Sequence, residues 1–212
     1  MDEHKSRAAK AADTRRRVVE RARELFLDQG YAATSTRQIA AAAEVTERTL
    51  FNIVPNKSEL LRQVLLDSVF VGYSGPMLER EDFVGLLGAS SAEEFLRGFV
   101  RWVTSLHTRS AVTAEMVRRA SVVDAGGAEL WQWGSARQVS DCRALVDLLR
   151  QRSWLRHGLT PAEAAASLAV LSGHETYWRF VTELGWTSRR YARWLNRHCL
   201  ELIGSAAQPA PS

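Results

Sequence analysis

Near the N-terminus, a short stretch carries side chains that could read the edges of DNA bases. They fall on one side of a helix of about two turns, and they are Thr46, Glu47, Arg48 and Asn52. A guanidinium can bond bidentately to guanine in the major groove, so Arg48 is the first candidate for direct base reading and the others are secondary candidates. Glu47 could instead be a partner of the helix dipole. The chemistry predicted here is the recognition of DNA bases.

Neighbouring side chains suit the DNA backbone better than the bases. Lys57 adds its charge to the exposed first turn of another helix, where free backbone N–H groups also attract anions. We expect phosphate contacts from Thr34, Thr36, Arg37, Thr49 and Lys57, and we include Phe51 in the same predicted DNA surface.

Three short helices between residues 34 and 61 must position these groups. Ser35 and Gln38 have the spacing of a capping box, which predicts a helix from residue 34 or 35 to about Ala43. A tight turn follows at Glu44–Val45. Thr46 then begins the second helix, because its hydroxyl can accept hydrogen bonds from free backbone N–H groups.

A third helix completes the unit. Pro55 ends the second helix, and Asn56 with Glu59 forms another capping box. The apolar residues that would join the first two helices are Ile39, Ala40, Val45 and Leu50. Two short helices joined by such a turn form a helix-turn-helix, whose second helix lies in the major groove.

The run from Thr14 to Leu61 resembles the N-terminal domain of the TetR family of bacterial transcriptional regulators. It covers roughly the first quarter to third of the chain. Spaced matches make the resemblance far more specific than a lone turn motif, and they are Phe26, Gly30-Tyr31, Thr34, Ile39-Ala40, Val45, Thr49-Leu50-Phe51 and Asn56-Lys57.

Three positions depart from the family's pattern. Glu44 stands where the family usually has the turn glycine, so the turn must accept a positive φ, at about 1–2 kcal/mol, or adopt another geometry. Phe51 replaces the usual tyrosine and lacks a hydroxyl that could reach a phosphate. Ile53-Val54 replace the usual aromatic pair and alter the packing under the second helix.

Composition sets wide bounds. The chain of 212 residues, 46% of them hydrophobic, can bury a core in one or two small domains. A net charge of +4 allows a polyanionic partner, but arginines recur along the whole chain, so charge alone decides little. Cys142 and Cys199 have no neighbouring ligand pattern, which favours reduced thiols. The charged N-terminus and the absence of a long apolar run predict a cytoplasmic protein without a membrane partner.

Helical periodicity continues to about Ile203, and we expect an all-α fold of about nine helices. Residues 1–12 form a basic arm, either frayed or touching DNA phosphate, ahead of a helix over residues 14–29. Further helices are predicted at 56–73, 91–107, 112–123, 128–152, 161–184 and 188–203, with a loop through Gly88.

These elements predict two domains and a tail. The DNA-binding domain with its arm takes residues 1–55, a helical effector-binding and dimerisation domain takes residues 56–204, and residues 205–212 form a disordered tail.

A stripe of small residues on the predicted helix at 161–184 would let another helix approach closely. The stripe consists of Ala162, Ala165, Ala166, Ala169, Ser172, Gly173 and Thr176. Such stripes also occur inside monomeric bundles, so periodicity alone leaves a dimer interface and internal packing open. The family resemblance implies a two-fold homodimer joined by a four-helix bundle, whose two recognition helices would read a palindromic DNA operator.

All seven tryptophans lie after residue 100, which indicates either a large aromatic core or a roomy, partly polar interior. The resemblance places several aromatic residues on helices that line an effector cavity. We predict that a hydrophobic or aromatic small molecule binds there, with His174 or Tyr177 supplying a hydrogen bond. The predicted lining is Phe95, Phe99, Trp102, Met116, Trp131, His174, Tyr177 and Trp178.

No enzymatic constellation is evident, so we predict no catalytic residue, no metal site and no cofactor. No two histidines have metal-ligand spacing, and the chain has no glycine-rich phosphate loop and no nucleophile elbow. The favoured function is a ligand-responsive transcriptional repressor. The alternative is a helical small-molecule-binding or scaffolding protein without sequence-specific DNA binding, which the unusual Glu44 and Phe51 make conceivable.

Overall fold

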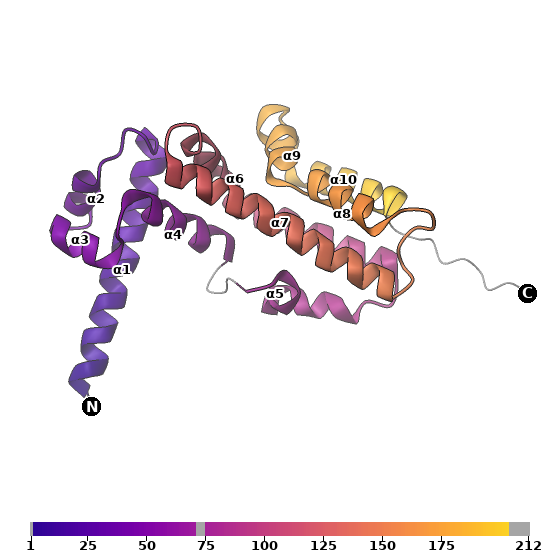
Figure 1. Ribbon diagram of the computed structural model, residues 1–212, viewed down its shortest axis with the longest axis horizontal. Helices are drawn as coiled ribbons and strands as arrows, with labels where there is room; N and C mark the ends of the chain where they lie inside the picture. The colour runs from indigo at the N-terminus through magenta and orange to yellow at the C-terminus, as the bar shows by residue number, and fades with distance from the viewer. Residues whose placement is uncertain (1, 71–74, 204–212) are drawn as a thin grey trace, which may run out of the picture. The chain divides into compact units, whose positions relative to one another are not determined.

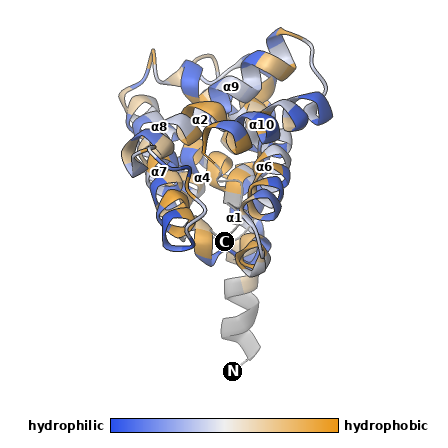
Figure 2. Cartoon of the chain, turned by 90° about the vertical axis from the view of Figure 1, so that its right-hand side faces the viewer, coloured by the Kyte–Doolittle hydropathy of each residue, from blue (hydrophilic) through white to orange (hydrophobic). Residues whose placement is uncertain are grey.

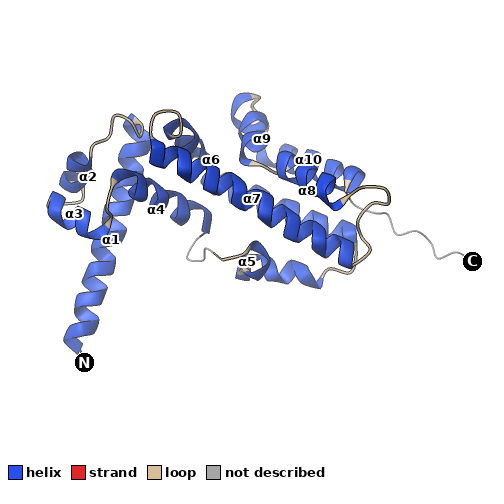
Figure 3. Ribbon diagram, viewed as in Figure 1, coloured by secondary structure: helices blue, strands red, loops and turns tan. Residues whose placement is uncertain are grey.

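A computed structural model describes residues 2–70 and 75–203, and every regular element in these ranges is helical (Figure 1, Figure 3). The predicted all-α fold is confirmed. The chain divides into two compact units, Met1–Gly72 with Val112–Gln132 and Tyr73–Ala111 with Trp133–Ser212. The first unit therefore extends beyond the expected boundary at residue 55. The predicted tail at 205–212 lies outside the described residues.

The first unit is built on α1 (Asp2–Gln29), α2 (Thr36–Ala42), α3 (Glu47–Ile53) and α4 (Lys57–Phe70). Helix α1 begins well before the expected residue 14. The expected arm is helical because it is rich in alanine, lysine and arginine, which are good helix formers. It also contains no glycine or proline. The core residues of these four helices are Val18, Ala22, Phe26, Ile39, Ala40, Leu50, Leu60, Leu61 and Val64.

The helix boundaries in this unit follow the predicted caps. The Ser35 side chain accepts a hydrogen bond from the Gln38 N–H, and the Gln38 side chain accepts one from the Ser35 N–H, so the capping box is complete. Thr46 caps α3 by accepting from the Thr49 N–H, and Asn56 accepts from the Glu59 N–H at 2.7 Å.

The turn between α2 and α3 adopts the left-handed conformation. Glu44 has a φ of 55°, so this glutamate takes the backbone shape that glycine adopts without strain. The Val45 N–H donates to the Ala40 carbonyl at 2.9 Å, and Arg17 Nε donates to the Ala43 carbonyl at 3.0 Å. These bonds satisfy carbonyls at the end of α2 and hold the turn against α1.

Two long helices contribute to both units. Helix α6 spans Ala92–Ala120 and α7 spans Ala125–Gln151. The prediction of separate helices at 91–107 and 112–123 is wrong, because residues 108–111 contain no glycine or proline and the helix continues through them. The expected loop before residue 88 contains three short helical segments, Met77–Glu79, α5 (Glu81–Val84) and Gly85–Gly88.

The single helix expected at 161–184 is also wrong. The chain forms α8 (Pro161–Leu171) and α9 (His174–Trp178), which runs into a π-helical turn at Arg179–Glu183. Gly173 lies where the chain breaks, and a Cβ atom there would lie 2.8 Å from the Ala169 carbonyl oxygen. The break is stabilised by Gln138 of α7, whose side-chain amide donates to that carbonyl at 2.9 Å.

The second unit ends with α10 (Ser188–Leu202), whose Tyr191, Leu195 and Cys199 are buried. Figure 2 shows hydrophilic residues along the outer sides of α6 and α7.

Cys142 and Cys199 are both buried and free, and burial raises the pKa of each thiol to about 12. None of the described helices is long and apolar enough to cross a membrane.

We expect Glu44→Gly to raise the free energy of unfolding by about 1 kcal/mol, because glycine adopts a positive φ without the Cβ penalty. Urea-induced unfolding followed by circular dichroism measures the change. The matched control is Glu47→Gly in the first turn of α3, which we expect to be destabilising by about 1 kcal/mol. A loss of stability in Glu44→Gly would contradict the assigned turn geometry.

Candidate nucleic-acid interface and aromatic clusters

Helix α3 has one exposed polar face and one buried apolar face. Leu50 is fully buried, whereas Glu47, Arg48 and Asn52 are exposed. Phe51 shares that exposed side, with 46% of its surface accessible. Such a face, on the second helix of a helix-turn-helix, has the side-chain types that bond base edges in the major groove.

The two threonines at the start of α3 are engaged with each other. The Thr46 hydroxyl accepts from the Thr49 N–H at 3.1 Å, and the two hydroxyl oxygens lie 2.9 Å apart. Thr46 is exposed and Thr49 is half-buried. They fix where α3 begins, and each hydroxyl that contacts DNA must do so while taking part in this cap.

The predicted phosphate contacts differ in accessibility. Arg37 is exposed in the first turn of α2, and Thr36 is half-buried beside it. Thr34 is 1% exposed, and its hydroxyl donates to the Gly30 carbonyl at 2.8 Å. The Thr34 side chain therefore fixes the connection between α1 and α2 rather than facing solvent, and Arg37 becomes the clearest phosphate candidate.

Lys57 lies in a more enclosed place than expected for a phosphate contact. Its ammonium nitrogen is 4.2 Å from the centre of the Tyr31 ring, and the side chain is half-buried. Burial lowers the pKa of Lys57, and the nearby Asp124 carboxylate opposes that shift. Sequence reasoning missed Asp124, because it lies 67 residues further along the chain than Lys57.

The side chains predicted to line a ligand cavity do not all belong to one unit. Met116 and Trp131 belong to the first unit. The second unit holds Phe95, Phe99, Trp102, His174, Tyr177 and Trp178.

One aromatic group in the second unit surrounds Trp102. The Trp102 and Phe83 rings pack edge to face with their centres 5.1 Å apart, and the Trp102 and Phe99 rings stack with their centres 6.5 Å apart. The ring centres of Phe95 and Phe83 lie 6.4 Å apart. The Arg80 guanidinium lies 5.5 Å from the Trp102 ring centre. Phe83 was missed because the sequence indicated a loop there, yet it is completely buried.

A second aromatic group joins α6 to α9. The centre of the His107 ring lies 5.2 Å from that of Tyr177 and 6.3 Å from that of His174. The ring centres of His174 and Trp178 lie 6.1 Å apart. His107 was not among the predicted lining residues, although it continues the apolar four-residue repeat through Val103.

Polar atoms are aligned inside this second group. His107 Nε2 is 2.8 Å from the Ser172 carbonyl oxygen, which fits a neutral imidazole donating from this nitrogen. Burial lowers the pKa of His107 to about 4. The Tyr177 hydroxyl lies 3.2 Å from the Thr108 hydroxyl and 2.9 Å from the Ser188 hydroxyl. The predicted hydrogen-bonding Tyr177 is therefore already part of a polar chain.

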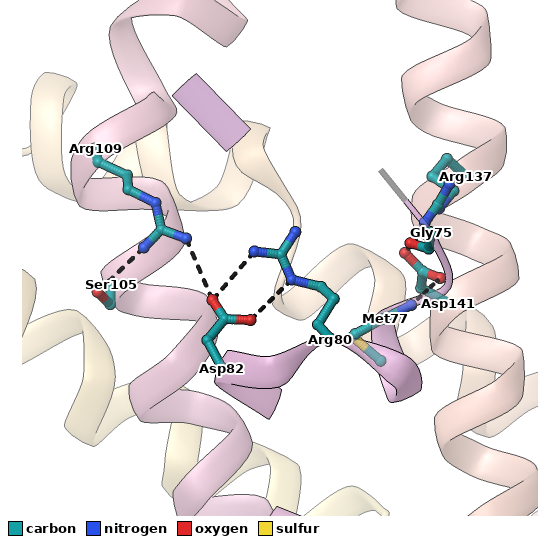
Figure 4. A network of polar contacts seen from close by, with 8 residues as sticks. All are labelled: Gly75, Met77, Arg80, Asp82, Ser105, Arg109, Arg137 and Asp141. Carbon is teal, nitrogen blue, oxygen red and sulfur yellow. Dashed lines mark hydrogen bonds and ion pairs between the residues drawn. The ribbon is translucent and has the colours of Figure 1, made fainter. Parts of the chain in front are cut away.

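Charged side chains fix the irregular segment before α6 (Figure 4). Arg80 donates to both carboxylate oxygens of Asp82, at 2.9 and 3.1 Å, and Arg109 of α6 lies 3.7 Å from the same carboxylate. The Arg80 hydrogen bond holds the pKa of Asp82 below its usual range. Nearby, Asp141 accepts from the Met77 N–H and pairs with Arg137, which attaches the segment to α7.

The predicted dimer stripe is partly internal. Ala165, Ser172 and Gly173 are buried within the chain. Ala162 and Ala166 are exposed, and Ala169 and Thr176 are half-buried. Large exposed aliphatic groups occur nearby in sequence at Val170 and Leu184. Within the described ranges, no three histidine, cysteine or acidic side chains are grouped to hold a metal ion.

Comparison with known proteins identifies the N-terminal region formed by α1–α4, called the head below. Residues 18–64 match the family described as bacterial regulatory proteins, tetR family. The predicted resemblance to this family is confirmed for the head, and the described chain has the fold of TetR-family transcriptional regulators. No curated protein matches the chain.

Solved structures share the fold over nearly the whole chain at low identity. A SmeT–triclosan complex is 19% identical, with a TM-score of 0.71, and 94% of this chain and all of that chain are covered. Native NalD of Pseudomonas aeruginosa, the secondary repressor of the MexAB-OprM multidrug efflux pump, is 22% identical with the same coverage and a TM-score of 0.70. A transcriptional regulator from Saccharomonospora viridis in complex with choline is 18% identical, with a TM-score of 0.67 and coverage of 92% and 100%.

The buried His107 predicts a pH-dependent stability. Its pKa is depressed in the folded chain, so its contribution is complete above its ordinary value near 6.5 and is lost as the pH falls toward about 4. We expect His107→Gln to remove up to about 3 kcal/mol of that dependence, measured by urea unfolding between pH 4 and 7.

The exposed His157 provides the control for this comparison. His157→Gln should leave the slope of the unfolding free energy against pH unchanged. Equal slopes in His107→Gln and the unchanged protein would mean that His107 titrates normally.

Proposed function

We propose that this chain is a transcriptional repressor that binds a palindromic DNA operator as a homodimer and is released by a hydrophobic or aromatic small molecule. The observation that carries the proposal is the exposed polar face of α3 on a helix-turn-helix of the tetR family. A protein of this family is generally a DNA-binding regulator and not an enzyme.

Direct base reading is assigned to Arg48, with Thr46, Glu47 and Asn52 as further contacts. Arg48 is exposed on a helix whose start is fixed by the Thr46 cap. Arg37 and Thr36 lie in the first turn of α2, where backbone N–H groups also favour a phosphate. The phosphate contacts position the head, and the α3 contacts select the sequence.

A homodimer would present two copies of α3 to the DNA. A two-fold dimer presents the same α3 face twice, about 34–36 Å apart, to successive major grooves of a palindrome. The exposed Ala162 and Ala166 with Val170 and Leu184 support an interface along α8 and the turn after α9. Burial of these apolar side chains would contribute to association.

A small apolar ligand is supported by the two aromatic groups of the second unit. The group around Trp102 supplies flat hydrophobic surfaces, and the group around Tyr177 adds hydroxyls and a neutral imidazole. The SmeT and Saccharomonospora structures, which contain triclosan and choline, support a small-molecule effector of some kind here. A ligand switches the protein only by the difference between its affinities for the two conformations.

Selection of bound duplexes from a random DNA pool, at two salt concentrations, tests this function. The expected result is enrichment of a palindrome with half-sites about one helical turn apart, and weaker binding at the higher salt. A pool without sequence enrichment at either concentration would contradict operator recognition and would favour a helical ligand-binding protein.

Substitutions on α3 and α2 should act differently on the selected operator. Arg48→Ala should relax the preference at one base position in each half-site, at about 1–3 kcal/mol. Arg37→Ala should weaken binding to all sequences alike and reduce the salt slope by about one. Fluorescence anisotropy with the operator and single-base variants measures both. If neither substitution changed binding, the assignment of α3 to the major groove would be wrong.

A further inference from the structure

The turn between α6 and α7 belongs to the same compact unit as the head, although it lies far along the chain. In this unit the turn contacts the first turn of α4. Gly126, the second residue of α7, lies so close to Ser58, the second residue of α4, that a Cβ atom on it would be 2.4 Å from both side-chain atoms of Ser58. That separation is shorter by about 1 Å or more than an ordinary contact between carbon atoms.

Hydrogen bonds and close packing hold the turn itself in place. The Asp124 carboxylate accepts from the Gly127 N–H at 2.8 Å and caps the start of α7. The Asp124 N–H donates to the Ala120 carbonyl at 3.0 Å, so the same residue also continues from the end of α6. Gly127 is buried, and a Cβ atom on it would lie 2.9 Å from the Ala120 backbone. The turn therefore has little room to move away from α4.

A short link ties the first turn of α4 to α3. The two helices are separated by Val54, Pro55 and Asn56. Val54 is 1% exposed and Leu60, in the first turn of α4, is completely buried, so the link is anchored in the core at both ends. The Asn56 side chain accepts from the Ser58 hydroxyl at 2.9 Å. A displacement of Ser58 is therefore passed through this link to α3.

We infer that the α6–α7 turn supports the DNA-binding head, and that Gly126 and Ser58 are positioning residues that fix α3 relative to the rest of the head. The inference rests on the proposed function, since it concerns the same reading helix. Glycine at position 126 permits the close approach because it has no side chain. Side chains that bind a ligand must be held within about 0.5 Å of their productive geometry, so a larger shift of α3 weakens the reading of sequence. The electrostatic attraction to phosphates is independent of sequence and is affected less.

A reciprocal change of side-chain size at the two positions tests this role. Gly126→Ala adds the atom that meets Ser58, and Ser58→Gly removes both side-chain atoms that it would meet. The added atom would also lie 3.3 Å from the Asp124 carboxylate, a much smaller overlap that the double variant retains. The matched control is Gly134→Ala in the same helix, because a Cβ atom there meets nothing within 4 Å.

The measurement is fluorescence anisotropy with the operator enriched from the random pool and with an unrelated duplex of equal length. Gly126→Ala should weaken operator binding about tenfold, the effect of losing one base contact, and binding to the unrelated duplex less than about twofold. In the Ser58→Gly background, the same substitution should change operator binding by less than about twofold. Gly134→Ala should bind both duplexes as the unchanged protein does. A change in the folded fraction alters both affinities equally, so their ratio reports the position of α3 rather than stability.

Three results would overturn the inference alone while the unchanged protein still binds its operator. The first is an unchanged ratio of the two affinities in Gly126→Ala. The second is an equal loss with and without the Ser58 side chain, which would mean that the added methyl group acts through Asp124. Should Gly126→Ala fail to fold, the double variant is expected to fold and to bind the operator as Ser58→Gly does, and its failure would be the third. Absence of an enriched operator would overturn the proposed function and this inference together.

Discussion

The packing of α3 on α2 is the constraint on which the rest of the head depends. Leu50 and Ile39 are completely buried, and Ala40 is 2% exposed. The small Ala40 allows the two helices to approach, and the left-handed Glu44 redirects the chain so that Leu50 faces inward. With Leu50 inside, the opposite side of a helix of two turns must face outward, and that side carries Arg48 and Asn52. Replacing Leu50 by alanine would remove about 2–5 kcal/mol of this anchoring.

The head could be predicted because its signals are local. Ser35 and Thr46 cap the helices that follow them, and each cap involves a partner only three residues away. The same local reasoning anticipated the strained turn at Glu44. It did not anticipate the burial of Thr34, whose hydroxyl donates to the Gly30 carbonyl four residues earlier.

The second unit was harder to predict because contacts distant in sequence decide its elements. The break at Gly173 depends on Gln138, and the neutral state of His107 depends on burial against α9. Aromatic composition alone could not place Phe83, which follows an irregular segment and is completely buried. The contact of Lys57 with the Tyr31 ring likewise requires the fold, since two separate parts of the chain supply it.

These interactions connect recognition with control in physical terms. Local capping fixes where α3 begins, whereas the α6–α7 turn packs against the start of α4 through Gly126. In the proposed function, Arg48 sets the sequence preference and Arg37 contributes affinity for every sequence.

Two copies of α3 are proposed to read successive major grooves. Dimethyl sulfate protection of guanine N7 on a bound duplex tests it most directly, because that atom lies in the major groove. Two protected patches are expected on one face of the duplex, about one helical turn apart. Replacing Arg48 by alanine should remove the protection of the guanines within them. Protection of a single patch, or protection that persists unchanged without Arg48, would contradict it.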